Sequence, residues 1–382
     1  AVTGVERLRD RFVDSQIRQT LSSLGRWESR NYVLEEIQEV FKEPSDIGLS
    51  AMMDQFWVAW QELSKNSSDP GRRTSVQQEA ISLSSALNLA ARQLHEMAQE
   101  VNSNVESALS RVNAAAQAIA VLNGEIMRAR LLGDNTGDLE DQRGLLIDQL
   151  ASDVDISVSV LSNGTVNIAV GGRILVSGNE SRELSAQTPV QNGRIKGLLE
   201  SANTLIPYYI EQLDILANSI ISQVNQVHRA GFDLAGNPGG DFFEGSGAAG
   251  IRVKQEILDD PSLIAAADSP TGAGNGANAL AIAQLKDMLT MNGGTATFRD
   301  FYGSMVTRLG LDTLESARSS DVYSGVLDQQ TARREAISGV SIDEELLSLI
   351  RYQSAFDAAS RLVNAVDEML ETLIHRTGLV GR

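Results

Sequence analysis

Hydrophobic side chains recur every three or four positions over the N-terminal part of the chain, which is the spacing of amphipathic helices. The first stretch predicts one long helix from Val13 to Phe41, and Pro44 marks a break after it. A shorter helix is expected over 51–65, followed by a polar loop over 66–72. The N-terminal part is therefore expected to be two helices joined by a short turn.

The most regular helical pattern follows, from Leu83 to Ile126. Its hydrophobic positions are separated by gaps of three and four residues, with one doubled gap of four at Val105, as in a coiled coil. The pattern predicts a rod-like helix of about sixty residues, roughly 80–90 Å long. We expect it to end at 133–137, with a short helix over 138–150.

The spacing then changes to the two-residue alternation of a β-strand. Hydrophobic and polar residues alternate over 154–160 and again over 166–170. Between these runs stand Asn163 and Gly164, a pair that tolerates the positive φ angles of a hairpin turn. The pattern predicts a small β-rich subdomain over 151–197.

Helical spacing returns in the second half. Helices are expected over 204–228, over 279–291 and from Ala296 onward, with a loop near Gly339. Between the first two helices lies a glycine-rich stretch, and short strands are expected near Ile251 and over 262–267.

These elements predict a mainly α fold with a β insertion: a long-helix bundle or coiled-coil domain that carries a small β-rich subdomain. The expected domains are a helical domain made of 1–150, 198–231 and 276–337, a β-rich subdomain over 151–197 to which 232–275 is a candidate addition, and a terminal-helix segment over 338–382.

The last helix carries a hydrophobic stripe that is wider than a helix needs for one neighbour. Its first row is separated by gaps of three and four, and a second row runs beside it. A helix of this kind suits partners on more than one side, although burial within its own subunit fits the periodicity equally well. The candidate assembly and chaperone-binding residues are Tyr352, Ala355, Phe356, Ala359, Leu362, Val363, Val366, Met369, Leu370 and Leu373.

Composition narrows the classes of function. The net charge of -18 disfavours binding to nucleic acid and to anionic membranes. The absence of cysteine excludes disulfides, thiol catalysis and cysteine-ligated metal sites. No hydrophobic run has the length of a transmembrane helix, and the first residues lack the hydrophobic core of a secretory signal peptide. If the protein leaves the cell, we expect it to do so without a cleavable signal.

The candidate chemistry is weak. His95, His228 and His375 are the three histidines, and none is near another in the sequence, so no metal site is predicted. The glycine spacing over 245–250 matches a dinucleotide-binding fingerprint, but neither flank is expected to supply the strand and helix that such a motif needs. The acidic loop over 134–141 lacks the glycine of a calcium loop. We therefore expect a protein without a cofactor and without catalytic residues.

Several runs of the sequence resemble the FlgK family of bacterial flagellar hook-associated proteins. The run LEEIQEVFKEPSDIGLSAMMDQFWVAWQELSKNSSDPGRR over 34–73 is the most specific. The other similar runs are VERLRDRFVDSQIRQTLSSLGRWESR over 5–30, DLEDQRGLLIDQL over 138–150, NQVHRAGFDLAGNPGGDFF over 225–243 and SGVSIDEELLSLIRYQSAFDAASRLVNAVDEMLETLIHRTGLVGR over 338–382.

The resemblance implies a structural protein of the extracellular flagellum, placed where the hook joins the filament. It implies export through the flagellar type III channel, with the chaperone FlgN binding the C-terminal helical region first. The implied partners are the hook protein, the second junction protein FlgL and a ring of its own copies. The family's N-terminal helical segment is missing, so we expect an N-terminally truncated chain. The β insertion is small, so we also expect the large outer domain of longer family members to be missing.

Two other functions fit the residues alone. The same helical repeats suit a cytosolic coiled-coil scaffold, and an extracellular adhesin or hydrolase could hold its site in the β-rich region. Detection of the protein in sheared external appendages would argue against the scaffold. A screen for activity on cell-wall glycans would test the hydrolase.

Overall fold

The structure is a computed structural model that describes residues 10–46, 48–272, 274–338 and 342–377. The chain divides into two compact units, one formed by Ser15–Asp328 and the other by Ala1–Asp14 together with Gln329–Arg382. We describe each unit by itself. The domain boundaries drawn from the sequence stay a prediction.

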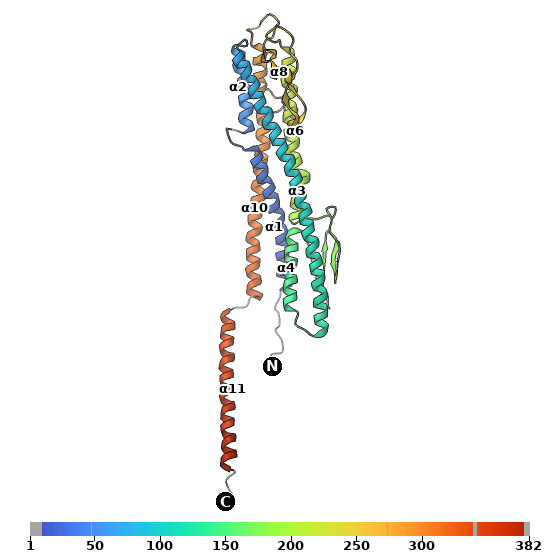
Figure 1. The fold of residues 1–382 in the computed structure, drawn as a ribbon, viewed down its shortest axis with the longest axis vertical. Coiled ribbons are helices and arrows are strands. Elements are labelled where there is room, and N and C mark those ends of the chain that lie inside the picture. The colour runs from blue at the N-terminus through green and yellow to red at the C-terminus, as the bar shows by residue number, and fades with distance from the viewer. Residues whose placement is uncertain (1–9, 47, 273, 339–341, 378–382) are drawn as a thin grey trace. The chain divides into compact units, whose positions relative to one another are not determined.

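The chain is mainly helical, as the periodicity predicted. The long helices of the first unit lie side by side in Figure 1. The helices are α1 (Arg11–Phe41), α2 (Leu49–Lys65), α3 (Pro70–Leu132), α4 (Gly137–Asp153), α5 (Arg194–Glu200), α6 (Ile206–Ala230), α7 (Gly247–Gly250), α8 (Gln255–Asp259), α9 (Ala277–Gln284), α10 (Phe298–Ser338) and α11 (Ile342–Thr377), with the π-helical turn η1 (Ser201–Leu205) and the 3-10 turns η2 (Pro261–Leu263) and η3 (Leu285–Asp287).

Helix α3 is the predicted rod, 63 residues long, or about 95 Å at 1.5 Å per residue. Its first turn corrects the loop expected over 66–72, because the helix already begins at Pro70. Proline suits the first helical position since its missing N–H would be unpaired there. The side chain of Asp69 caps the helix by accepting the N–H of Gly71 at 2.8 Å. Gly133 ends it with a left-handed φ of 79°.

Helix α1 is held between two groups of helices. On one side, the Arg18 guanidinium donates to Asp148 of α4 at 3.0 Å. On the other side, the side-chain amide of Gln38 donates to the Thr313 hydroxyl of α10 at 3.0 Å. These contacts join sequence positions far apart, so α1 ties the bundle together.

One group of aromatic residues lies within the main hydrophobic core. Trp60 and Phe56 of α2 are fully buried and meet Phe242 from the glycine-rich stretch at ring-centroid distances of 5.2 and 6.4 Å. Trp57 stacks on Phe298 at the start of α10 at 5.6 Å. The rest of this core is mostly aliphatic, with side chains from α1, α3, α6, α9 and α10, and it includes a second aromatic group in which Phe41 contacts Tyr209 and Tyr302.

The predicted β insertion forms one antiparallel sheet in the order β1-β2-β3-β4. Its strands are β1 (Ser157–Val160), β2 (Val166–Val170), β3 (Arg173–Ser177) and β4 (Glu180–Ser181). Gly164 in the first turn has a φ of 86°, as the Asn-Gly pair suggested. The first strand starts later than expected, because Val154 ends α4 and is buried in the second core.

Asn123 of α3 fastens the sheet to the rod. Its side-chain amide donates to the carbonyl of Val166 at 2.9 Å and its oxygen accepts the Val166 N–H at 3.1 Å. The Arg143 guanidinium of α4 donates to the same Asn123 oxygen and to the carbonyl of Gly164, both at 2.8 Å. The sheet is therefore held by polar bonds as well as by hydrophobic packing.

The segment between α6 and α10 is less regular than predicted. The strand expected over 262–267 is wrong for its first residues, because η2 ends at Leu263 and only Ala267 pairs in a β-bridge, with Phe232. The helix expected over 279–291 ends earlier, at Asp287. The predicted strand near Ile251 is confirmed as β6 (Arg252–Val253), which pairs with β5 (Phe243–Glu244).

Candidate assembly interface

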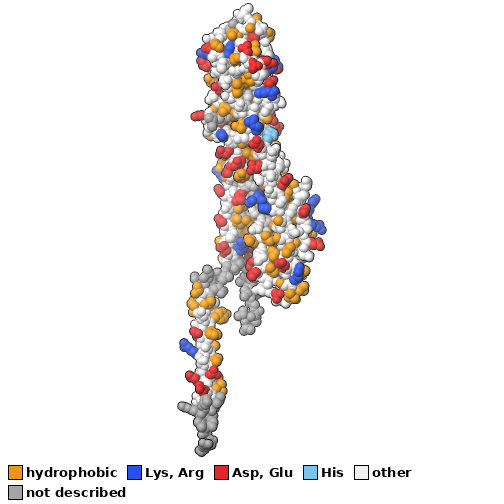
Figure 2. All heavy atoms as spheres, in the orientation of Figure 1, with side chains coloured by type: hydrophobic (Ala, Val, Ile, Leu, Met, Phe, Trp, Pro, Cys, Tyr) orange, Lys and Arg blue, Asp and Glu red, His pale blue; other side chains and the backbone are white. Residues whose placement is uncertain are grey.

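The ten candidate assembly residues all lie on α11 and all are exposed. Of the larger side chains, Val366 is the least exposed at 47% and Phe356 the most exposed at 74%. Figure 2 shows hydrophobic side chains following this helix. The role of these residues in assembly stays a prediction.

Four further hydrophobic side chains are exposed nearer the start of α11 than the ten candidates. The additional exposed side chains are Leu346, Leu347, Leu349 and Ile350. Leu349 was visible in the sequence as the start of the second row, one heptad before Phe356. The other three lie off the stripe, and Leu346 and Ile350 are on the same side of the helix as Asp357.

The opposite side of α11 is charged. Residues three and four apart share a helix face, so the hydrophobic rows leave a separate polar face of exposed residues that includes Asp357, Arg361, Asp367, Glu368 and Glu371. A helix with one hydrophobic and one acidic face can bind the hydrophobic surface of another chain. The site therefore supports association rather than chemistry.

Of the two histidines whose side chains the structure describes, His228 is buried, and both of its ring nitrogens are paired. Nδ1 lies 2.7 Å from the carbonyl oxygen of Gly240, and Nε2 accepts the N–H of Ala265 at 2.9 Å. This pairing requires a neutral ring that carries its proton on Nδ1. Burial lowers the pKa of His228 to about 4, although the hydrogen bond to the Gly240 carbonyl and the nearby Asp241 each act to raise this pKa. The ring thus fastens the chain around 240 and 265 to α6.

His95 is exposed on α3, with Nδ1 2.7 Å from the carbonyl of Ala91. The side chain of His375 lies outside the described residues. Within the described part of the chain, no group of three histidine, cysteine or acidic side chains is placed to hold a metal ion. In the same residues, no helix is both long and hydrophobic enough to cross a membrane.

The glycine-rich motif over 245–250 turns the chain between β5 and β6. The expectation that no strand precedes it is wrong, since Phe243–Glu244 form β5. Its backbone amides are already used: the N–H of Gly247 donates to Asn218 at 2.8 Å and that of Ala248 to the carboxylate of Asp214 at 2.7 Å. A carboxylate at this position would repel a phosphate, so the motif is a turn held by side chains of α6.

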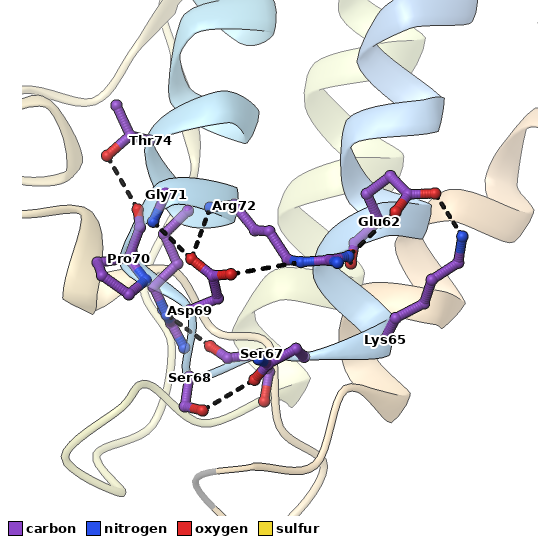
Figure 3. Close-up of polar contacts among 11 residues, drawn as sticks. Glu62, Lys65, Ser67, Ser68, Asp69, Pro70, Gly71, Arg72 and Thr74 are labelled. Carbon is purple, nitrogen blue, oxygen red and sulfur yellow. Dashed lines mark hydrogen bonds and ion pairs between the residues drawn. The ribbon is translucent and has the colours of Figure 1, made fainter.

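The start of α3 is a dense polar joint, shown in Figure 3. Arg72 reaches back to Glu62 of α2 at 3.0 Å and to Asp69 at 3.5 Å. Its neighbour Arg73 points the other way and is 2% exposed. The Arg73 guanidinium donates to four backbone carbonyls, those of Ser67 at 2.7 Å, Pro261 at 3.2 Å, Ser262 at 3.2 Å and Ile264 at 2.7 Å. The joint is structural, because these bonds connect α2, α3 and the segment over 261–264 within the chain.

Protein-family models match two parts of this chain. The family model described as the Flagellar hook-associated protein FlgK helical domain matches residues 34–192 and 185–243, which together make up more than half of the chain. A second model, Flagellar basal body rod FlgEFG protein C-terminal, matches residues 335–375 and so covers most of α11.

Two related proteins from different bacteria are both named Flagellar hook-associated protein 1. The chain is 29% identical to Flagellar hook-associated protein 1 of Bacillus subtilis (strain 168) over 436 residues, covering 99% of this chain and 86% of that protein. It is 22% identical to the protein of that name from Salmonella typhimurium, covering 98% and 89%. The solved structure of the flagellar hook junction protein FlgK from Burkholderia pseudomallei has the same fold, with a TM-score of 0.73, 17% identity, and coverage of 85% of this chain and 100% of that one. On the match of the helical-domain model, the chain belongs to the FlgK family of flagellar hook-associated proteins.

Proposed function

We propose that this protein is a structural junction subunit between the flagellar hook and the filament, without catalytic activity, and that its C-terminal helix α11 is the part that assembles with other chains. The observation that supports the proposal is the exposed hydrophobic stripe of α11, from Leu349 to Leu373. A face of this size is costly to leave in water. It becomes favourable when it is covered by a partner.

The match of the flagellar rod C-terminal model to 335–375 supports this placement of the contact. The partners we propose are the hook protein, the second junction protein FlgL and neighbouring copies of the chain, with FlgN covering the same face before export. Each of these partners would bury hydrophobic side chains of α11 that are exposed in the single chain.

We also propose export through the flagellar type III channel and a final location outside the cell. A chain that passes through a narrow channel must travel unfolded, and the absence of cysteine removes cross-links that would prevent this. The assembled state would then be stabilised by contacts between subunits rather than by disulfides.

The proposal is tested by placing charges on the hydrophobic face. The double variant Leu362→Asp with Val366→Asp puts two carboxylates into the centre of the stripe. We expect cells that carry it to assemble hooks without filaments and to release unpolymerised flagellin, because a buried unpaired carboxylate opposes association strongly. Electron microscopy of the flagella and immunoblotting of the medium measure both effects.

The matched control is Ser360→Asp with Asn364→Asp, which adds the same two charges at the same spacing on the polar face of α11. These cells should keep their filaments. Both variants should retain the circular dichroism and unfolding transition of the parent protein, because the substituted side chains are exposed. Normal filaments in the Leu362, Val366 double variant would refute the proposal.

A further inference from the structure

The sequence contains five asparagine–glycine pairs, which begin at Asn123, Asn163, Asn192, Asn275 and Asn292. In such a pair the glycine nitrogen can attack the side-chain amide carbon of the asparagine, because glycine has no Cβ to obstruct the approach. The attack requires an asparagine side chain that is free to turn and a glycine N–H that no other group holds. The fold decides which of the five pairs meets both requirements.

Asn292 and Gly293 lie in the short loop that leads from η3 to α10. Two backbone hydrogen bonds close this loop: Met291 donates to the carbonyl of Ala296 at 2.9 Å, and Ala296 donates to the carbonyl of Met291 at 3.2 Å. Met291 is buried, whereas Asn292, Gly293 and the following Gly294 are exposed. Two successive glycines give the backbone of the loop a wide choice of conformations.

Both reacting groups of this pair are free. Among the residues that the structure describes, neither the side-chain amide of Asn292 nor the N–H of Gly293 makes a hydrogen bond. The neighbouring groups do: the Thr295 hydroxyl donates to the carbonyl of Asn292 at 3.0 Å, and Gly294 donates to the carbonyl of Met291 at 3.0 Å. These bonds shape the loop without holding the two groups that would react.

The pair Asn163–Gly164 in the turn between β1 and β2 is held at both groups. The side-chain oxygen of Asn163 accepts the N–H of Thr165 at 3.1 Å and its hydroxyl at 2.8 Å. The N–H of Gly164 donates to the carbonyl of Leu161 at 3.0 Å. This turn is therefore protected although Asn163 is exposed.

The pair before α5 is also held at both groups. The side-chain amide of Asn192 donates to the hydroxyl of Ser23 on α1 at 2.8 Å. The N–H of Gly193, which is buried, donates to the carbonyl of Ser22 at 2.8 Å. Attack by this glycine nitrogen would require α1 to release the segment.

The two remaining pairs are fixed as well. Asn123 is buried within α3, and its side chain is bonded to the sheet and to α4. The side-chain amide of Asn275 donates to Asp268, and its oxygen accepts the N–H of Ala277 at 2.8 Å. The glycine of that pair, Gly276, is buried. Asn292 is thus the one asparagine of the five whose pair combines exposure with two unbonded groups in the described chain.

We infer that Asn292 is a site of spontaneous deamidation in the folded protein. The Gly293 nitrogen loses its proton to a base in solution and bonds to the side-chain amide carbon of Asn292. The amide nitrogen takes up a proton and leaves as ammonia, so a succinimide ring remains. Water then opens the ring at either carbonyl carbon and gives aspartate or isoaspartate. The inference is independent of the proposed function, because it depends on this loop alone.

The modification changes both the charge and the backbone of the loop. Either product adds one negative charge, and isoaspartate also adds one methylene group to the main chain. The added methylene lies between Met291 and Ala296, so we expect the isoaspartate form to lose the hydrogen bonds that close the loop. The same loop leads to Phe298, which stacks on Trp57 of α2 in the main core.

The test is to incubate the purified protein in mildly alkaline buffer and to follow all five pairs by peptide mass spectrometry. Labelling with an isoaspartyl-specific carboxyl methyltransferase identifies the isoaspartate product. We expect Asn292 to react first. The other four should react at least about tenfold more slowly, because one or more hydrogen bonds must break before their glycine nitrogens can attack.

The same incubation in concentrated urea is the built-in control. Unfolding removes the bonds that distinguish the pairs, so their rates should become similar, and Asn292 should gain least. If another pair reacts as fast as Asn292 in the folded protein, the inference is overturned. Protection of Asn292 by folding to the same degree as Asn163 would overturn it too.

Two variants give an independent check. Asn292→Gly removes the reacting amide and keeps a residue that accepts the positive φ of 50° found at this position. It should abolish the early isoaspartate signal. The matched control, Asn163→Gly, removes the asparagine of the β1–β2 turn and should leave that signal unchanged. An early signal that persists in Asn292→Gly would show that the modification occurs elsewhere.

Discussion

Nδ1 of His228 lies 2.7 Å from the carbonyl oxygen of Gly240, twelve residues further along the chain. The same ring accepts the N–H of Ala265 on its other nitrogen at 2.9 Å. One neutral side chain thus holds two loop segments against α6. Protonation would remove the acceptor for Ala265 and leave a charge in the aromatic cluster formed with Trp60 and Phe242.

This arrangement predicts a stability that depends on pH. Burial lowers the pKa of His228 from 6.5 to about 4 in the folded protein. At a pH between these two pKa values, His228 is protonated in the unfolded chain and neutral in the folded chain. The free energy of unfolding therefore falls as the pH is lowered through this range. We expect this histidine to account for a loss of roughly 3 kcal/mol between pH 7 and pH 4, at about 1.4 kcal/mol per pH unit of pKa difference.

The measurement is urea unfolding of the protein at a series of pH values. His228→Gln should reduce the slope of unfolding free energy against pH in this window, whatever its effect on the absolute stability. His95→Gln is the control, because it removes a histidine at an exposed position. An equal slope in the His228 variant and the parent would contradict the assignment.

Arg72 and Arg73 are neighbours in the sequence, yet we predict very different costs for replacing them. Arg73→Met leaves four carbonyls without their donor, and we expect a loss of at least about 3 kcal/mol at 1–3 kcal/mol for each buried unsatisfied group. Arg72→Met removes partly exposed ion pairs with Glu62 and Asp69, which contribute less than about 1 kcal/mol. Denaturant midpoints of the two variants give the comparison. Similar losses would mean that the carbonyls of Arg73 find other donors.

Close packing between α1 and α5 predicts that Gly197 cannot carry a side chain. A Cβ at this position would lie 2.2 Å from the Ser29 hydroxyl and 2.4 Å from the carbonyl oxygen of Arg26. We expect Gly197→Ala to destabilise the protein by roughly 1–3 kcal/mol through overpacking.

The matched control is Gly303→Ala on the exposed side of α10, where a Cβ meets nothing within 4 Å. This change should stabilise the helix by about 0.5–1 kcal/mol, because alanine loses less backbone entropy than glycine. Thermal unfolding of the two variants separates the predictions by the sign of the shift. A gain in stability for Gly197→Ala would show that the two helices can move apart at low cost.

Trp60 offers a test of the aromatic cluster. It is fully buried against Phe56, Phe242 and His228, and its indole N–H has no hydrogen-bond partner. Trp60→Ala should cost about 3–5 kcal/mol, the usual range for removing a large buried ring. Trp60→Phe keeps most of the packing and removes the unpaired donor, so we expect a much smaller loss. Comparable losses in both variants would show that the indole N–H is bonded in solution.

The helices were predictable because their signals are local. The three- and four-residue spacing from Leu83 to Ile126 requires no knowledge of the rest of the chain, and α3 follows it throughout. The strand pair around Asn163 and Gly164 was found for the same reason. Errors occurred where the backbone bonds to distant residues, as at Leu263, whose segment supplies carbonyls to Arg73 rather than to a neighbouring strand.

The candidate assembly face was predictable only in part. The rows on α11 are visible as periodicity, but periodicity cannot distinguish a helix buried in its own subunit from one that is exposed. The hollow between α1 and α3 was not visible at all, because Glu36 and Glu100 are brought to one rim only by the packing of α1 on α3.

The sequence by itself determined the kind of protein this is: helical, acidic, free of cysteine, with a small β insertion and a terminal helix with a wide hydrophobic face, and similar to the FlgK family. These properties depend on composition and on the order of residues along single elements. The tertiary structure alone decided which side chains are buried, paired or exposed, as with His228, Arg73 and Val366. The reason is that burial and charge environment depend on residues that are distant in sequence and meet only when the helices pack.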